Sequence, residues 1–219
     1  MANTPLYTLY DKAECPFCWK VRLVCLLKGV AFDEITIDTD AKPAEFLALS
    51  PKGKVPVLQG DGWILEESKV IVAFLEENHP EPALLSDAHA LEIEAYSDKS
   101  IGVAIRDAIF MRRAQAPADW DHEVLERCQR NWDEVLTTLE AQCDADGPWF
   151  LGGNPSVADC ALVARFALAA YYGLEGVHAY PRVASWWQRM VPRLLDQPTT
   201  PAAIRTHLMA RLPPPTATQ

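Results

Sequence analysis

The spacing of hydrophobic and polar positions changes several times near the start of the chain. Residues 6–10 form a short apolar run with the length of a strand, and residues 32–37 alternate apolar and polar side chains, which predicts a half-buried strand. Between them, apolar positions recur at helical spacing over residues 16–28, and Gly29 ends that pattern. These spacings predict a strand–helix–strand unit.

The alternation of strand and helix patterns continues to residue 78. Residues 43–49 are predicted to form a short helix, and residues 67–78 carry apolar side chains at helical spacing. Residues 55–58 and 63–65 are predicted strands joined through Gly60-Asp61-Gly62, a strong hairpin signal. The order βαβαββα predicts an α/β domain whose mixed sheet has a parallel crossover at its front and a hairpin at its back.

The pattern is different after His79-Pro80-Glu81-Pro82, which predicts a boundary between a domain of residues 1–80 and an all-α domain of residues 88–219. From residue 87 onward no segment has a convincing strand pattern. Ser156 and Asp159 have the spacing of a capping box and predict the start of a helix. The helical patterns cover residues 88–113, 119–143, 157–172 and 182–190.

Composition and charge exclude several classes of function. The 219 residues are 49% hydrophobic and 23% charged, as in soluble globular proteins, and no apolar run has the length of a membrane span. The net charge of −10 disfavours binding to nucleic acid or stable association with anionic membranes. The N-terminus lacks the pattern of a signal peptide, so six cysteines predict a reducing, cytoplasmic location.

The candidate chemistry is concentrated in Cys15-Pro16-Phe17-Cys18, where the first strand gives way to the first helix. Pro16 is expected in the first helical turn, where its missing N–H has no consequence. The free N–H groups and positive dipole end of the helix favour a thiolate at Cys15, and Lys20 and Arg22 add positive charge nearby. We therefore predict a nucleophilic Cys15 and a deeper, less ionised second thiol at Cys18.

The C-x-x-C pair has two other interpretations, half of a zinc site and a pair of structural cysteines. A zinc site would need a second C-x-x-C or a suitably spaced Cys/His pair, and the sequence contains neither. Structural cysteines would more plausibly lie inside a helix than on both sides of a proline at its start. The other cysteines lie singly in apolar or amphipathic helical patterns: Cys25, Cys128, Cys143 and Cys160. We therefore predict no metal site.

In order and spacing, a set of short motifs resembles the cytosolic glutathione transferase superfamily, which has a thioredoxin-like domain followed by an all-helical domain. A catalytic cysteine looks most like the omega-type branch, with glutaredoxin-2-like proteins nearby. Most omega-type members have no cysteine at the position of Cys18, so dithiol chemistry stays open. The motifs are Cys15-Pro16-Phe17-Cys18, Lys42-Pro43, Val55-Pro56-Val57-Leu58, Glu67-Ser68 and Ser156-Val157-Ala158-Asp159.

The resemblance implies a binding site for glutathione as co-substrate. A cis bond between Val55 and Pro56 would present the Val55 backbone to the cysteinyl part of glutathione as an added strand. Ser68 and the N–H groups at its helix start suit a carboxylate, and Glu67 can pair with the γ-glutamyl ammonium. From the local sequence alone, Glu67-Ser68 is equally well a helix cap.

Three further positions belong to this interpretation. Lys42 is the implied partner of the glycyl carboxylate, although a lysine before a helix is more often solvated surface. Phe17 completes the implied glutathione site. Trp186 and Trp187 could line a substrate pocket, but aromatic residues in such a helix are more often core.

The resemblance also implies an activity and a homodimer. Cys15 would attack a glutathione mixed disulfide or an oxidised acceptor, and a second glutathione would release the enzyme as glutathione disulfide. Deglutathionylation, dehydroascorbate-type reduction and conjugation to a small electrophile are all compatible with it. The alternative is a non-enzymatic regulatory or protein-binding factor, but Cys15, Glu67 and Ser68 together favour the enzyme.

Overall fold

The computed structural model describes residues 6–211, which pack as two compact units. The first consists of the chain up to Glu94 together with Pro155–Ala164, and the second of Ala95–Asn154 and the chain from Arg165. The predicted domain limits at residues 80 and 88 follow the order of elements along the chain rather than this packing, and they stay a prediction.

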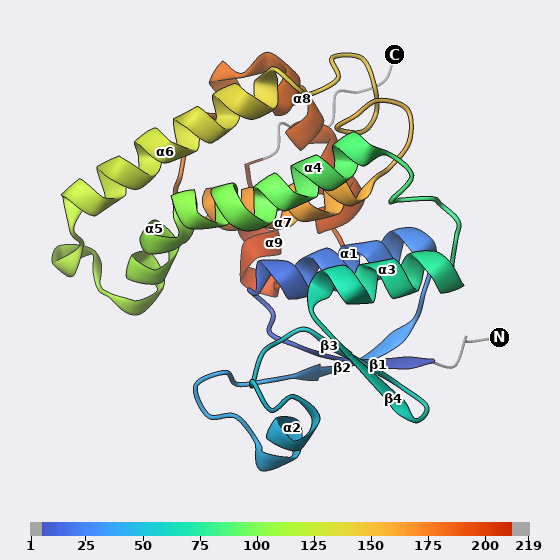
Figure 1. Cartoon of the computed structure of the whole chain (residues 1–219). Coiled ribbons are helices and arrows are strands. Elements are labelled where there is room, and N and C mark those ends of the chain that lie inside the picture. The colour runs from blue at the N-terminus through green and yellow to red at the C-terminus, as the bar shows by residue number, and fades with distance from the viewer. Residues whose placement is uncertain (1–5, 212–219) are drawn as a thin grey trace. The chain divides into compact units, whose positions relative to one another are not determined.

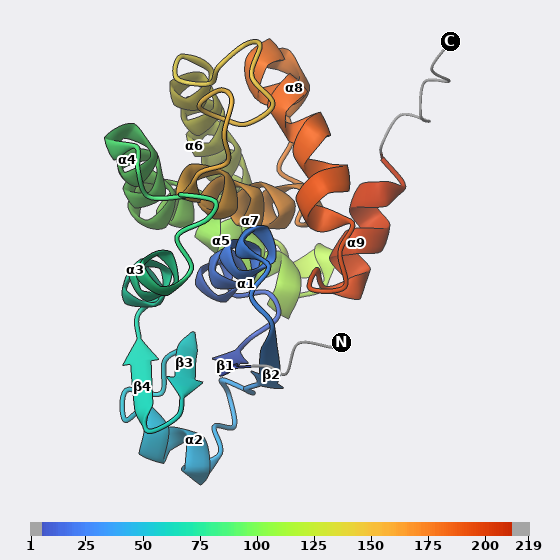
Figure 2. The same ribbon diagram turned by 90° about the vertical axis from the view of Figure 1, so that its right-hand side faces the viewer.

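The first unit contains a four-stranded sheet with the strand order β2-β1-β3-β4 (Figure 2). β1 and β2 are parallel, whereas β3 is antiparallel to both β1 and β4. This confirms the predicted mixed sheet, with its parallel crossover and its hairpin. The strands are β1 (Tyr7–Asp11), β2 (Phe32–Thr36), β3 (Val57–Gly60) and β4 (Trp63–Glu66).

The helices of this unit confirm the predicted thioredoxin-like order. α1 (Pro16–Lys28) and α3 (Ser68–Asn78) cover one face of the sheet, and α2 (Ala44–Leu49) lies on the other side (Figure 1). α1 begins at a proline and ends where Gly29 adopts φ 64°, so that its N–H bonds to the Cys25 and Leu26 carbonyls. These two residues made both limits of α1 predictable.

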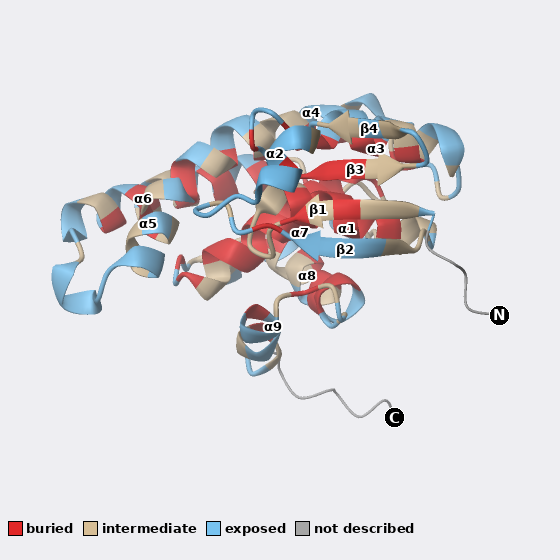
Figure 3. Cartoon of the chain, turned by 90° about the horizontal axis from the view of Figure 1, so that it is seen from below, coloured by how far each residue is buried: buried red, intermediate tan, exposed pale blue. Residues whose placement is uncertain are grey.

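β2 differs from the prediction, because it is exposed rather than half-buried. It is an edge strand, and Asp33 to Thr36 are all exposed, as Figure 3 shows. The first buried position is Ile37, just beyond the strand, where its N–H donates to the Asp11 carbonyl at 2.7 Å. Ile37 packs with Phe46 and Val57, so the apolar residue of this segment fills the side of the sheet that carries α2.

The second unit is helical, and the described residues beyond 87 form only one isolated β-bridge, between Trp149 and Gly152. The predicted helix over residues 88–113 contains a π-helical turn, and the one predicted over 119–143 is shorter, because Asp121 caps its start. The helix α9 was not predicted. From residue 88 on, the helices are α4 (Ala88–Tyr96), α5 (Gly102–Ala114), α6 (His122–Glu140), α7 (Val157–Tyr171), α8 (Pro181–Met190) and α9 (Ala202–Met209), with π-helical Ser97–Ile101 and Val191–Leu195.

Aromatic side chains form the centre of the second unit. The Phe166 ring lies 4.9 Å from that of Trp132 and 5.2 Å from that of Trp186, both nearly edge-on. Trp186 is completely buried, which confirms its assignment to the core, whereas Trp187 is only partly buried.

The start of α7 shows one half of the predicted capping box, the bond from the Ser156 N–H to the Asp159 carboxylate. Asp159 Oδ2 accepts hydrogen bonds from the Ser156 N–H at 3.0 Å and from Ser156 Oγ at 3.2 Å, and both side chains are buried. The Val157 N–H donates to the Leu84 carbonyl at 3.0 Å, which ties this segment to the first unit. Within residues 6–211, none of the helices combines the length and the apolar composition needed to cross a bilayer.

Candidate active site

Cys15 is the N-cap residue of α1 and is partly exposed, whereas the five other cysteines are buried. Its N–H donates to the Lys12 carbonyl at 2.9 Å, and its own carbonyl accepts from the Trp19 N–H at 2.9 Å. The first turn of α1 contains no acidic side chain. The Cys15 side chain forms no capping hydrogen bond, so the positive end of the helix dipole is what favours a thiolate at this position.

Cys18 is fully buried one turn further along α1. Burial raises the pKa of its thiol well above the ordinary value, and a hydrogen bond to Cys15 and the negative charge of a Cys15 thiolate act in the same direction. These effects act in the direction of the expectation that Cys18 is the less ionised thiol, which stays a prediction.

A buried ion pair holds the turn that leads to Cys15. Arg22 Nη1 lies 2.6 Å from Asp11 Oδ2, and Arg22 Nη2 donates to the Ala13 carbonyl at 2.6 Å. Burial raises the pKa of Asp11 to about 7, although Arg22 lowers it, and Glu34 and Cys15 raise it further. Asp11 ends β1, so this pair joins the sheet, the turn and α1. The sequence offered one signal for it, a carboxylate at the end of a buried strand.

The prediction that Lys20 and Arg22 add positive charge near Cys15 is wrong in one respect. Lys20 and Arg22 are both buried and paired, Lys20 Nζ with Glu94 Oε1 at 2.7 Å and Arg22 with Asp11. Each cation is therefore balanced by a carboxylate. The electrostatic support for a Cys15 thiolate comes from the end of α1 and not from these two side chains.

The strand pairing brings the other predicted site segments to the same end of the sheet. Val57 at the start of β3 lies between Tyr10 near the end of β1 and Glu66 at the end of β4. Cys15 follows β1, Val55 precedes β3 and Glu67 follows β4. Three segments that are distant in the sequence therefore converge at one edge.

The loop before β3 is fixed in a defined shape. The Val55–Pro56 bond is cis, as the resemblance implied. Ser50 Oγ donates to Glu66 Oε1 at 2.6 Å and accepts from the Lys54 N–H at 3.3 Å, so the end of β4 braces this loop. The carboxylate of Glu66 thus has a structural partner.

Glu67, unlike Glu66, has a left-handed backbone conformation and an exposed side chain. It has φ 68° and is the only described residue other than glycine with a positive φ. Although it occupies the N-cap position of α3, its exposed side chain forms no capping hydrogen bond there. The helix-cap interpretation therefore fails for the Glu67 carboxylate. Ser68, the first residue of α3, is buried, and its backbone N–H belongs to the free donors of the helix start.

The remaining two predicted site residues lie in neighbouring segments. Lys42 is exposed, and its aliphatic stem passes Gly53 so closely that a Cβ there would lie 2.9 Å from Lys42 Cδ. Lys42 therefore borders the loop that leads to Val55. Phe17 is partly exposed, with Lys20 Nζ 5.9 Å from its ring centroid. Across the described chain, no group of three or more His, Cys, Asp or Glu side chains is arranged to hold a metal ion.

The comparisons with known proteins all point to the same family. The profile of the glutathione S-transferase N-terminal domain matches residues 9–83, and that of the C-terminal domain matches residues 123–189. The chain is 31% identical over 186 residues to glutathione S-transferase DHAR3, chloroplastic, of Arabidopsis thaliana, which covers 82% of this chain and 66% of that protein. It is 30% identical over 190 residues to maleylacetoacetate isomerase of Pseudomonas aeruginosa, covering 81% of this chain and 86% of that protein. The solved structure of rice GST1 (OsGSTU1) in complex with glutathione superimposes with a TM-score of 0.75 at 25% identity, covering 93% and 96% of the two chains.

Proposed function

Because this chain belongs to the glutathione S-transferase family, we propose that it is a glutathione-dependent thiol transferase whose nucleophile is Cys15. Glutathione is the co-substrate of the family. One observation carries the proposal: Cys15 is a partly exposed thiol at the N-terminus of α1, one turn from a buried thiol whose pKa is raised by its burial. A binding-only protein has no need of that arrangement.

The glutathione site is assigned to the segments that converge at one end of the sheet. The Val55 backbone binds the cysteinyl part as an added strand. Glu67 binds the γ-glutamyl ammonium, and the start of α3 at Ser68 binds the adjacent carboxylate. Lys42 pairs with the glycyl carboxylate, and Phe17 borders the thiol.

The reaction consists of two thiol–disulfide exchanges. The Cys15 thiolate attacks the glutathionyl sulfur of a mixed disulfide, so that a Cys15–glutathione disulfide forms and the acceptor leaves as a thiolate that takes a proton from water. The thiolate of a second glutathione attacks the same glutathionyl sulfur, which releases glutathione disulfide and restores the Cys15 thiolate. Cys18 takes no covalent part, because its raised pKa makes it a slow nucleophile, and it stabilises the Cys15 thiolate by donating a hydrogen bond. Reduction of an oxidised small acceptor such as dehydroascorbate uses the same thiolate: the acceptor takes up two electrons and two protons from two glutathiones, which leave as glutathione disulfide.

The test combines retention on immobilised glutathione with a thiol-transfer assay on a small glutathione mixed disulfide. Cys15→Ser should lose nearly all activity, and Cys18→Ser should keep most of it. After treatment with glutathione disulfide, the intact mass of Cys18→Ser should increase by one glutathionyl group that maps to Cys15. An active Cys15→Ser variant would refute the assignment of the nucleophile.

Two other outcomes are equally informative. Loss of activity in Cys18→Ser, with Cys15 still alkylated normally, would establish a dithiol route and a glutaredoxin-2-like subclass. Retention on glutathione without any transfer would favour the regulatory, protein-binding alternative. We also assign the protein to the cytoplasm and to a homodimer; light scattering on the purified protein tests the dimer.

A further inference from the structure

Asp11 and Glu34 form a carboxyl pair on the face of the sheet that α1 covers. In the parallel register of β1 and β2, Leu9 pairs with Glu34 and Asp11 with Thr36. Paired residues and residues two apart share a face of a sheet, so both carboxyl groups lie on the same side. Asp11 is fully buried, whereas Glu34 belongs to β2, the exposed strand in Figure 3, and 36% of its side chain is exposed. The buried carboxyl group therefore has a neighbour that reaches solvent.

One nitrogen of Arg22 bridges the two carboxyl groups. Arg22 Nη1 lies 2.6 Å from Asp11 Oδ2 and 3.8 Å from Glu34 Oε1. Among the described residues, the second Asp11 oxygen, Oδ1, has no hydrogen-bond partner although it is buried. A buried carboxylate oxygen without a donor is costly, whereas a protonated oxygen can itself donate, and the neighbouring Glu34 carboxylate is a suitable acceptor. One guanidinium therefore faces two carboxyl groups that together favour a single negative charge.

The charged groups around Asp11 come from three segments. α1 contributes Arg22, β2 contributes Glu34, and the turn after β1 contributes Cys15. β3, on the other side of β1, has no charged side chain. Lys12, the next residue in the chain, donates through its Nζ to Thr39 Oγ1 at 2.5 Å.

Two interactions connect the carboxyl pair with the nucleophile. Arg22 Nη2 donates to the Ala13 carbonyl at 2.6 Å, two residues before Cys15. Burial raises the pKa of Asp11 to about 7, and the negative charge of a Cys15 thiolate adds to that effect. Because coupling between two sites is reciprocal, a proton on Asp11 in turn favours the thiolate at Cys15. The charge of Asp11 also acts on Cys18, whose pKa is raised chiefly by burial.

From this geometry we propose that Asp11 is a positioning residue for the nucleophile: it shares one proton with Glu34 beside Arg22, and it holds this proton while Cys15 is a thiolate. When a glutathionyl group is attached to Cys15, the sulfur loses its negative charge, and the carboxyl pair releases a proton to solvent through Glu34. The inference rests on the proposed function, because it concerns the same sulfur.

The carboxyl pair also compensates for the protons of the two thiol–disulfide exchanges. In the first exchange the acceptor leaves as a thiolate and takes a proton from water, while the carboxyl pair releases a proton to water. In the second exchange a glutathione thiol loses its proton and attacks, and the carboxyl pair takes up a proton as the Cys15 thiolate is restored. Each exchange therefore changes the protons of the solvent less than it would without the pair.

The test follows the Asp11 carboxyl carbon by NMR in ¹³C-labelled protein, with the signal assigned through its own backbone. In the reduced protein this carbon should titrate near pH 7. Capping Cys15 with neutral iodoacetamide, or the Cys15→Ser substitution, should lower the midpoint by about 0.5–1 pH unit, because Cys15 acts on Asp11 more weakly than Arg22 or Glu34 does. Glu34→Gln should lower the midpoint as well, since the second carboxyl group is then lost.

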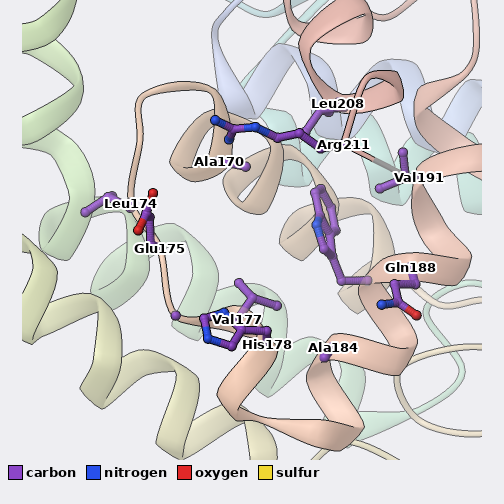
Figure 4. Close-up of a pocket in the computed structure, with 12 residues that line it drawn as sticks. Ala170, Leu174, Glu175, Val177, His178, Ala184, Gln188, Val191, Leu208 and Arg211 are labelled. Carbon is purple, nitrogen blue, oxygen red and sulfur yellow. The ribbon is translucent and has the colours of Figure 1, made fainter. Parts of the chain in front are cut away.

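Two other carboxylates provide matched controls. Asp33→Asn changes the exposed neighbour of Glu34 in β2, whose side chain lies on the opposite face of the sheet. Glu175→Gln changes the wall of a cavity of about 420 Å³ between α7, α8 and α9 in the second unit (Figure 4). Both variants remove one negative charge, as Glu34→Gln does, but neither should lower the Asp11 midpoint as Glu34→Gln does.

Proton uptake gives a second measurement. At pH 7 in weak buffer, glutathione disulfide should attach one glutathionyl group to Cys15 and release one glutathione, which takes up about one proton. The natural protein should take up about 0.25–0.4 proton less than Asp11→Asn, the fraction that the lower midpoint releases. If thermal unfolding shows that Asp11→Asn does not fold, Glu34→Gln takes its place and should also take up more protons than the natural protein.

Three results would overturn the inference. They are an Asp11 midpoint below about pH 5 in the reduced protein, the same midpoint in reduced and capped protein, and an effect of Asp33→Asn as large as that of Glu34→Gln. Capping by iodoacetamide needs no transferase activity. Failure of the proposed function would appear as absence of glutathionylation with the NMR titration unaffected, whereas failure of the carboxyl pair would leave glutathionylation intact.

Discussion

Glu67 provides the sharpest test of the site. Relief of its backbone strain should stabilise the fold, whereas loss of its carboxylate should weaken glutathione binding. Its φ of 68° lies in a region that side chains with a Cβ rarely adopt, and its exposed carboxylate makes no capping hydrogen bond. Glu67→Gly removes the strain and the carboxylate together, whereas Glu67→Ala removes only the carboxylate. The pair therefore separates stability from binding.

The magnitudes follow from these two differences. Backbone strain of this kind costs on the order of 1–3 kcal/mol, and glycine offsets about 0.5–1 kcal/mol of the relief through the greater freedom of the unfolded chain. The free energy of unfolding of Glu67→Gly should thus be about 0.5–2 kcal/mol higher than that of Glu67→Ala, which corresponds to a Tm about 1–8 °C higher at this chain length. Both variants should bind glutathione about 10- to 150-fold more weakly, because a hydrogen bond to a charged group contributes about 1.5–3 kcal/mol.

Thermal unfolding followed by circular dichroism gives the first quantity. Titration calorimetry with glutathione, in a Cys15→Ser background that prevents thiol exchange, gives the second. Glu66→Ala is the matched control, because it removes the carboxylate that accepts the hydrogen bond of Ser50 Oγ. It should lower the Tm, and it should weaken glutathione binding less than the Glu67 variants do. Equal stability of the Gly and Ala variants would refute the strain argument, and unchanged affinity in both would remove Glu67 from the site.

Three further outcomes are expected. Iodoacetamide should label Cys15 at about pH 6, below the ordinary thiol pKa of roughly 8.5, while the buried cysteines stay unlabelled in peptide mass spectra, and labelling that follows an ordinary thiol would contradict the role of the helix end. The pKa of Asp11, raised to about 7, means that its proton contributes stability that is complete below about pH 4 and is lost as the pH rises through 7. In urea titrations at pH 5 and 7, the natural protein should therefore lose stability relative to Asp11→Asn by up to about 1.4 kcal/mol per pH unit, and parallel curves would argue against the buried proton. Ser156→Ala should lower the free energy of unfolding by about 0.5–2 kcal/mol, and a neutral effect in the same titration would show that the cap of α7 contributes little.

The parts of the fold that local signals determine were predictable. Pro16 and Gly29 mark the ends of α1, and Gly60-Asp61-Gly62 marks the hairpin, because these residues restrict the backbone wherever they occur. The exposure of β2 was not predictable, since alternation indicates which side chains share a face but not whether another element covers that face. α9 has only eight residues, which is too short for a clear periodicity.

In the candidate site, too, local patterns were predictable and interactions with distant residues were not. The motif at Cys15 was evident, because a proline and two thiols at a helix start are a local pattern. The neutralisation of Lys20 was not, because its partner Glu94 lies 74 residues further along the chain. The distinction between Glu66 and Glu67 also depended on the structure, since only the observed bond to Ser50 shows which carboxylate already has a partner.

The division of α7 between the two units has a consequence for biosynthesis. The sheet and the turn that carries Cys15 are translated first, but their unit also includes Pro155–Ala164, where Val157, Ala158 and Cys160 are fully buried. A nascent chain on the ribosome therefore exposes part of this core until more than half of the sequence has been translated. A stop codon placed just after the last helix of the sheet, α3, should yield a fragment that needs chaperones or aggregates, although it contains Cys15 and every predicted glutathione contact.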